Sequence, residues 1–328
     1  MTSMRAISAT IALAFAGASS PLSAQQVVPF ERGVPVAPTG LQDQALGTGP
    51  WRYRTAENMD VQVSLVASVE WPYAMAFLPT GEMLVTTRTG TIRMIDREGR
   101  LQPQPLAGGP PSLFRARSGT LGAVHGYMSI VVHPRFAENR LIYFTANRPE
   151  QDGYVGAVYR ARLEGTKLED LKELLPGAQI RGATSLAMTP DGLLWVATGG
   201  DAAAQDGNSL AGKVLRLTDD GRPAPGNPFI GRTGFRPEIY TLGHRAANGL
   251  TVHPSTGEVF LSEMGPNGGD EINLLKPGRN YGWPVVSLGR TYPGPWQAGA
   301  NAPGHGGYEP PLAYWTPSIS GSGLTFYT

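Results

Sequence analysis

The chain has 328 residues, with 27 basic and 26 acidic side chains, a formal net charge of +1 and no cysteine. This charge balance gives no support for nucleic acid or an anionic membrane as a partner, and it indicates a small ligand close to neutral. Without disulfides, stability must come from a packed core. The 43 glycines and 29 prolines predict frequent turns and few helices.

The N-terminus has the pattern of a secretory signal. Arg5 precedes a largely apolar run over 6–17, and the small-residue sequence Pro21-Leu22-Ser23-Ala24 resembles a cleavage site. The apolar run is too short to span a bilayer, so we expect no membrane insertion and a periplasmic or secreted location. The expected parts are a signal peptide, an N-terminal extension and one large β domain, at 1–24, 25–54 and 55–328.

Short segments rich in β-branched and aromatic residues follow one another along the rest of the chain, which is typical of strands. These segments are Val61–Val66, Met83–Thr87, Thr91–Ile95, Leu141–Thr145, Leu193–Ala197, Val214–Leu217 and Glu258–Ser262. The best helical candidate is Leu168–Leu175. We therefore expect an all-β fold.

One pattern, a strand followed by a proline-containing turn and a second strand, occurs four times. Its turns lie at Ala76–Gly81, Ile130–Pro134, Leu186–Gly192 and Leu250–Gly257. Repetition at roughly 55 to 65 residues, with about four strands a unit, predicts a β-propeller. The segment Ser318–Thr328 begins a further strand that then stops.

The segment Ser262–Pro284 has the composition of an ion-binding loop. Its glycines and prolines allow sharp turns that can aim backbone carbonyls inward. Glu263, Asp270 and Glu271 add hard oxygen ligands of the kind that calcium prefers. From these residues alone, an acidic surface turn is the alternative.

Five longer motifs occur in order: NSLAGKVLRL at 208–217, YTLGHR at 240–245, EMGPNGGDEINLL at 263–275, NYGWP at 280–284 and PPLAYWTPSIS at 310–320. Together they resemble the soluble pyrroloquinoline-quinone-dependent sugar dehydrogenases of the glucose/sorbosone dehydrogenase family. The resemblance covers roughly residue 64 to the C-terminus. It implies a six-bladed β-propeller, which this chain would leave truncated in its last blade.

The resemblance also implies two cofactors, pyrroloquinoline quinone (PQQ) and calcium. The carbonyls of Gly265 and Pro266 would bind the calcium ion that bridges to PQQ. Arg245 would contact the cofactor near its reactive carbonyl, and Met264 lies beside this site, where a polar residue is common in the family. A second, structural calcium ion would use residues that align with Glu271 and Tyr281.

The activity implied by the resemblance is oxidation of an aldose to a lactone. A general base takes the proton of the anomeric hydroxyl while hydride passes to the quinone. At the position of the family's catalytic histidine, however, this chain has Arg181, which stays protonated and cannot accept that proton. The partner aspartate is displaced by one residue, to Asp201, and His125 is a candidate replacement base. The catalytic candidates are Arg245, Asp201 and His125.

Three functions stay open. The first is PQQ-dependent oxidation of aldose sugars, with an electron acceptor that the sequence does not identify. The second is a non-catalytic or truncated propeller that binds calcium or a saccharide, an alternative favoured by Arg181. The third is a calcium-dependent hydrolase of the lactonase type, with Asp201 or Glu263 as the base. The order of the motifs favours the dehydrogenase over the hydrolase.

Overall fold

The computed structural model describes residues 30–31, 34–35, 47, 49–115, 124–151, 153–176, 180, 183–290 and 305–327. The chain divides into two units, Met1–Asp43 and Gln44–Thr328. In the first unit, β1 (Phe30–Glu31) pairs with β2 (Val34–Pro35), and the expected signal peptide lies outside the described residues. Among the residues that are described, no helix has the length and apolar character needed to cross a membrane.

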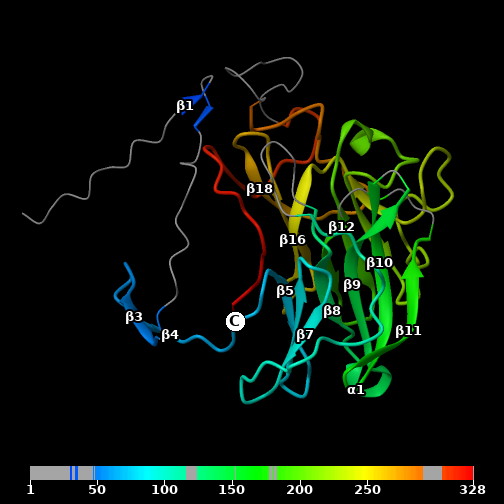
Figure 1. The fold of residues 1–328 in the computed structure, drawn as a ribbon. Helices are drawn as coiled ribbons and strands as arrows, with labels where there is room; N and C mark the ends of the chain where they lie inside the picture. The colour runs from blue at the N-terminus through cyan, green and yellow to red at the C-terminus, as the bar shows by residue number, and fades with distance from the viewer. Residues whose placement is uncertain are drawn as a thin grey trace, which may run out of the picture. The chain divides into compact units, whose positions relative to one another are not determined.

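The second unit is built from antiparallel sheets that follow one another along the chain (Figure 1). A hairpin of β3 (Trp51–Arg54) and β4 (Asp60–Val63) comes first. The first sheet contains β5 (Pro72–Phe77), β6 (Met83–Thr87) and β7 (Ile92–Ile95). The second contains β8 (Tyr127–Val132), β9 (Leu141–Glu150), β10 (Gly153–Glu164) and β11 (Lys167–Leu174), with α1 (Phe136–Asn139) between β8 and β9.

The third and fourth sheets each have four strands. The third contains β12 (Ala183–Met188), β13 (Leu194–Thr198), β14 (Lys213–Leu217) and β15 (Ile239–Leu242), and the short 3-10 helix η1 (Ala202–Gln205) lies between β13 and β14. The fourth contains β16 (Ala246–Val252), β17 (Val259–Met264), β18 (Asp270–Leu274) and β19 (Ala313–Trp315). Each of the seven strand segments listed from the sequence overlaps an observed strand. The further strand expected to begin in Ser318–Thr328 is not present in the described residues 318–327.

The first strands of successive sheets, β5, β8, β12 and β16, lie side by side (Figure 1). Buried serines join them, because Leu186 N donates to Ser129 Oγ and Leu250 N donates to Ser185 Oγ, both at 2.9 Å. Consecutive meanders that meet through their first strands are the blades of a β-propeller. The predicted all-β propeller is thus confirmed, with four blades in the described residues, while six blades and truncation remain predictions.

The hydrophobic core consists of three layers, one between each pair of neighbouring sheets. Because successive side chains of a strand point to opposite faces, adjacent residues enter different layers. Phe144 packs between the first and second sheets, whereas Tyr143 packs between the second and third. Trp195 belongs to the third layer and Leu194 to the second. The inner sheets are therefore buried on both faces.

The helical candidate Leu168–Leu175 is wrong, because this segment is strand β11. Its leucines follow a three-residue spacing that matches a helix face. In the structure, the register with β10 shifts within this strand, where Asp170 has a φ of 51°. The bulge sends Leu168 into the first core layer and Leu174 into the second. A bulged strand therefore produces the spacing that suggested a helix.

Candidate functional site

Arg245, Asp201 and His125 lie at one end of the blades, because each blade begins and turns there. The first strand of every described blade starts opposite the C-terminal half of its second strand, in the pairs Pro72↔Thr87, Tyr127↔Ala146, Ala183↔Thr198 and Ala246↔Met264. Neighbouring blades also meet there, since Gly126 N donates to Arg88 O and Gly200 N donates to Arg245 O, both at 2.6 Å. We call this end the rim.

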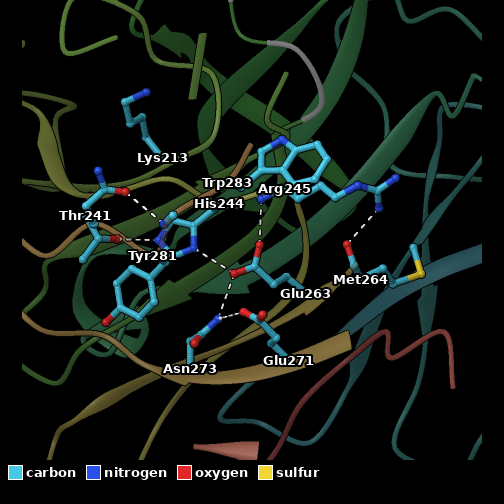
Figure 2. Close-up of polar contacts among 12 residues, drawn as sticks. Lys213, Thr241, His244, Arg245, Glu263, Met264, Glu271, Asn273, Tyr281 and Trp283 are labelled. Atoms are coloured by element: carbon cyan, nitrogen blue, oxygen red, sulfur yellow. Dashed lines mark hydrogen bonds and ion pairs between the residues drawn. The ribbon is translucent and has the colours of Figure 1, made fainter. Parts of the chain in front are cut away.

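Arg245 lies at the rim immediately before β16. Its Nη1 donates to the carbonyl oxygen of Met264 at 2.9 Å (Figure 2). The same Nη1 donates to the carbonyl oxygen of Gly265 at 3.0 Å. The guanidinium also lies over the ring of Trp283, 5.2 Å from the ring centre. The structure therefore brings together Arg245, Met264 and Gly265, which the sequence singled out separately.

The loop before Arg245 is fixed by the fully buried His244. Its Nε2 lies 2.8 Å from Thr241 Oγ1, its Nδ1 lies 3.0 Å from Glu263 Oε1, and its ring stacks on Tyr281 (Figure 2). Glu263 Oε2 accepts from the Arg245 backbone N–H at 2.7 Å. His244 and Glu263 thus set the path of the backbone that presents Arg245.

Tyr281 is held by its hydroxyl as well as by its ring. The hydroxyl donates to the Leu274 carbonyl and accepts from Lys276 N at 3.1 Å. Burial raises the pKa of Tyr281 well above its usual value. The phenol oxygen is therefore hydrogen-bonded to the backbone of the predicted ion-binding segment Ser262–Pro284.

Two buried carboxylates, Glu263 and Glu271, share one donor. Asn273 Nδ2 donates to Glu263 Oε1 at 2.8 Å and to Glu271 Oε2 at 3.1 Å (Figure 2). His305 Nε2 lies 3.2 Å from Glu271 Oε1. Burial is the main cause that raises the pKa of Glu271, and the neighbouring Glu263 adds to it. Sequence reasoning found no partner for His305, which comes from a Gly/Pro-rich stretch without a local pattern.

A small hollow of about 20 Å³ lies beside these carboxylates. It has room for one water molecule or one ion. Its lining includes Glu263, Glu271, Gly265 and Pro266. In the described part of the chain, no three acidic or histidine side chains converge to hold a metal, so a cation would need both carboxylates and backbone carbonyls. That set of hard oxygens suits calcium.

Asp201 lies at the rim after β13. It is exposed, and its Oδ1 accepts from Ala203 N at 2.8 Å, which caps η1. The preceding residue, Gly200, is bonded to Arg245 O, so the backbones that carry Asp201 and Arg245 are adjacent. Arg181 lies outside the described residues.

His125 lies at the rim before β8, in contact with Arg88 and Tyr73. Arg88 Nε donates to His125 Nδ1 at 2.9 Å, so the neutral ring has its proton on Nε2. Burial, with help from the charge of Arg88, lowers the pKa of His125. To accept a proton, this ring would have to displace Arg88 from Nδ1.

The chain is similar to known sugar dehydrogenases. The family model described as Glucose / Sorbosone dehydrogenase matches residues 69–328. An aldose sugar dehydrogenase of Escherichia coli, YliI, is 33% identical, and the match covers 86% of this chain and 76% of the relative. Quinoprotein glucose dehydrogenase B of Acinetobacter calcoaceticus is 28% identical, with 71% and 54% covered.

A solved structure shows a similar fold with a cofactor bound. It is the PQQ-bound form of an aldose sugar dehydrogenase from Streptomyces coelicolor, with a TM-score of 0.61 and 31% identity. The similarity covers 79% of this chain and 72% of that chain. The likeness is thus one of sequence as well as of fold.

Proposed function

Because the chain belongs to the glucose/sorbosone dehydrogenase family, we propose that it oxidises aldose sugars to lactones with PQQ as the electron acceptor. The observation that supports this most directly is Arg245, which is held at the rim over the carbonyls of Met264 and Gly265. A guanidinium is always charged and can meet anionic oxygens with two N–H groups at once. The names of the relatives indicate the same chemistry.

The carbonyls of Gly265 and Pro266 support the proposed calcium site that would bridge to PQQ. When bound, PQQ supplies a two-electron acceptor and calcium supplies a Lewis acid. Gly265 O accepts from Arg245, and Pro266 O accepts from Arg290 N at 2.7 Å. Since a carbonyl oxygen has two lone pairs, each can accept one further contact from a cation.

We assign the second proposed calcium ion to the hollow. Glu263 and Glu271 are 5% and 8% exposed, and two buried carboxylates are costly without a compensating cation. Glu271 keeps its predicted role as a ligand. The hydroxyl of Tyr281 is bonded to the backbone of Leu274 and Lys276. We therefore propose that Tyr281 holds the segment 274–281 in place.

The proton of the anomeric hydroxyl needs a base from this chain. Oxidation at that carbon removes one proton and one hydride, and Arg181 cannot take the proton. We propose Asp201, because its carboxylate is exposed at the rim and oriented by the Ala203 N–H. His125 is the weaker candidate, since Arg88 occupies its Nδ1.

The hydrolase alternative loses support from Glu263. This carboxylate is buried, and both of its oxygens already accept hydrogen bonds, from His244, Asn273 and the Arg245 backbone. It is therefore poorly placed to activate a water molecule. The non-catalytic alternative is the outcome that a negative test would favour.

Two further expectations belong to this proposal. We propose that the four described blades are part of a six-bladed ring, as the family resemblance implies. We also propose a periplasmic or secreted location, which rests on the signal pattern at the N-terminus.

The proposal is tested by adding PQQ and calcium to the purified protein and following reduction of an artificial electron acceptor by aldoses. We expect turnover, and an Arg245→Met variant should bind PQQ at least about tenfold more weakly, since a charge-assisted contact is lost. Arg232→Met is the matched control, because Arg232 lies over Phe235. An absence of both turnover and a PQQ absorbance change would overturn the proposal.

A further inference from the structure

Lys213 is a fully buried lysine that the proposed mechanism does not use. It begins β14 inside the NSLAGKVLRL motif and is 0% exposed. A buried ammonium is costly unless every N–H has a partner. Here Nζ donates to three carbonyl oxygens, those of Ala203 at 3.2 Å, Ala204 at 2.9 Å and Ala211 at 2.6 Å.

All three acceptors belong to one loop, 199–212, which contains Asp201 and η1. The ammonium thus ties η1 and the C-terminal end of this loop to the start of β14. Thr198 Oγ1 adds a second fixed point, because it donates to Leu210 O at 2.6 Å and accepts from Lys213 N at 3.0 Å. Two of the side chains that shape the loop, those of Lys213 and Thr198, are therefore buried.

The same loop is bonded to the segment that presents Arg245. Gly200 N donates to Arg245 O at 2.6 Å, His244 N to Gly212 O at 3.1 Å, and Gly243 N to Ala204 O at 3.2 Å. The two backbones are close enough that a Cβ on Gly200 would come within 1.9 Å of His244 O. Ala204 O accepts from both Lys213 Nζ and Gly243 N, so one oxygen links the lysine to the Arg245 segment.

We propose that Lys213 is a positioning residue whose buried ammonium holds the loop 199–212 against the segment 243–245, and so fixes Asp201 relative to Arg245. The consequence for turnover rests on the proposed function. The consequence for the loop does not, because it follows from the hydrogen bonds alone.

The protonation of Lys213 gives this arrangement a pH dependence. Burial lowers the pKa of Lys213 to about 8, and the carboxylates of Asp206 and Asp201 oppose that shift. His244 is the other titratable group on the adjoining segment, and its ring faces Thr241 and Glu263. Above pH 8 the neutral amine has two N–H groups for three carbonyls, so the loop loses one bond.

The titration of Lys213 cannot loosen the loop by weakening the whole fold. In the unfolded chain Lys213 keeps its proton up to about pH 10.5, so between pH 8 and 10.5 the unfolded state binds more protons. The contribution of this group to the free energy of unfolding then rises with pH. A loop that loosens in this window while the fold does not weaken is therefore attributable to the amine.

The test uses the absence of any native cysteine. In Lys213→Cys the thiol is unique, and alkylation of the unfolded chain with 2-bromoethylamine followed by refolding restores an amine at this position.

The readout is hydrogen exchange of the Gly200, Gly243 and His244 amides, which measures how firmly the loop is held. Gly126 N, which donates to Arg88 O at another blade boundary, is the internal control. Lys172→Cys, an exposed lysine bonded to Asp220 O, is the matched variant.

We expect Lys213→Cys and Lys213→Met to lose protection at the three reporter amides by at least about tenfold, with Gly126 unchanged, and we expect aminoethylation to restore it. Wild-type protection, corrected for intrinsic exchange, should fall above pH 8, and that of Lys213→Met should not. Where turnover is present, kcat should follow the same pattern. Unchanged protection in a folded Lys213→Met protein, or no rescue by aminoethylation, would overturn the inference. An absence of turnover in every protein would count against the proposed function alone.

Discussion

Glu271 is a carboxylate buried beside a second carboxylate, Glu263, with the Asn273 amide as their common donor. A divalent cation in the hollow would offset both charges. Calcium at about 100 times its Kd should then stabilise the protein by roughly 2.7 kcal/mol. We predict that Glu271→Gln loses most of this stabilisation, whereas Glu258→Gln, in an exposed turn, keeps it. Calorimetric melting with calcium or with a chelator measures the effect, and equal calcium shifts in both variants would contradict the assignment.

The sequence identified the residues of this site better than their contacts. Composition alone pointed to Glu263 and Glu271 as oxygen ligands, and both line the hollow. It could not show that Glu263 Oε1 is bonded to His244 and Asn273, because those contacts depend on strands β17 and β18 pairing in one register. His305 was missed for the same reason, since its partner Glu271 is 34 residues away.

Two of the described blade boundaries are bridged by a buried serine on a first strand, Ser129 on β8 and Ser185 on β12. Ser185 Oγ, on β12, accepts from the buried Leu250 N on β16 at 2.9 Å. Removing this acceptor leaves a buried N–H unpaired, which costs about 1–3 kcal/mol. We predict that Ser185→Ala lowers the free energy of unfolding by this amount in urea denaturation. Ser255→Ala, in an exposed turn, should change it by less than about 0.5 kcal/mol, and a similar loss in both variants would refute the role.

At the scale of strands, the seven segments listed from periodicity all overlap observed strands, and the one helical assignment failed where a bulge changed the spacing of the apolar residues. Met83–Thr87 was predicted with the bounds that the structure shows, because a clear turn precedes it. The segment around Leu168 and Leu174 was assigned to a helix, since three-residue spacing and a shift of faces at Asp170 give the same pattern. Only the pairing with β10 distinguishes a bulged strand from a helix in this segment.

For the whole molecule, the four-fold repetition of turns predicted successive sheets, but the sequence could not show which faces they leave open. The first sheet buries one face, where Ala74 and Ala76 pack into the first core layer. On its other face Met75 and Phe77 are 54% and 62% exposed. They line an apolar cleft of about 650 Å³ together with Leu65 and Val66. Contiguous apolar surface of this kind marks a place where further protein packs.

This open face predicts how the 328-residue chain behaves in solution. Because apolar area removed from water contributes about 25 cal/mol per Å², the face should drive concentration-dependent self-association. Replacing both exposed side chains, in Met75→Ser/Phe77→Ser, should shift the protein toward monomer in sedimentation equilibrium and leave its melting temperature nearly unchanged. Ala76→Ser, on the buried face of the same strand, should do the reverse: it lowers the melting temperature and leaves association intact. If the unmodified chain is monomeric at all concentrations, the face that carries Met75 and Phe77 does not mediate self-association, and the prediction is wrong.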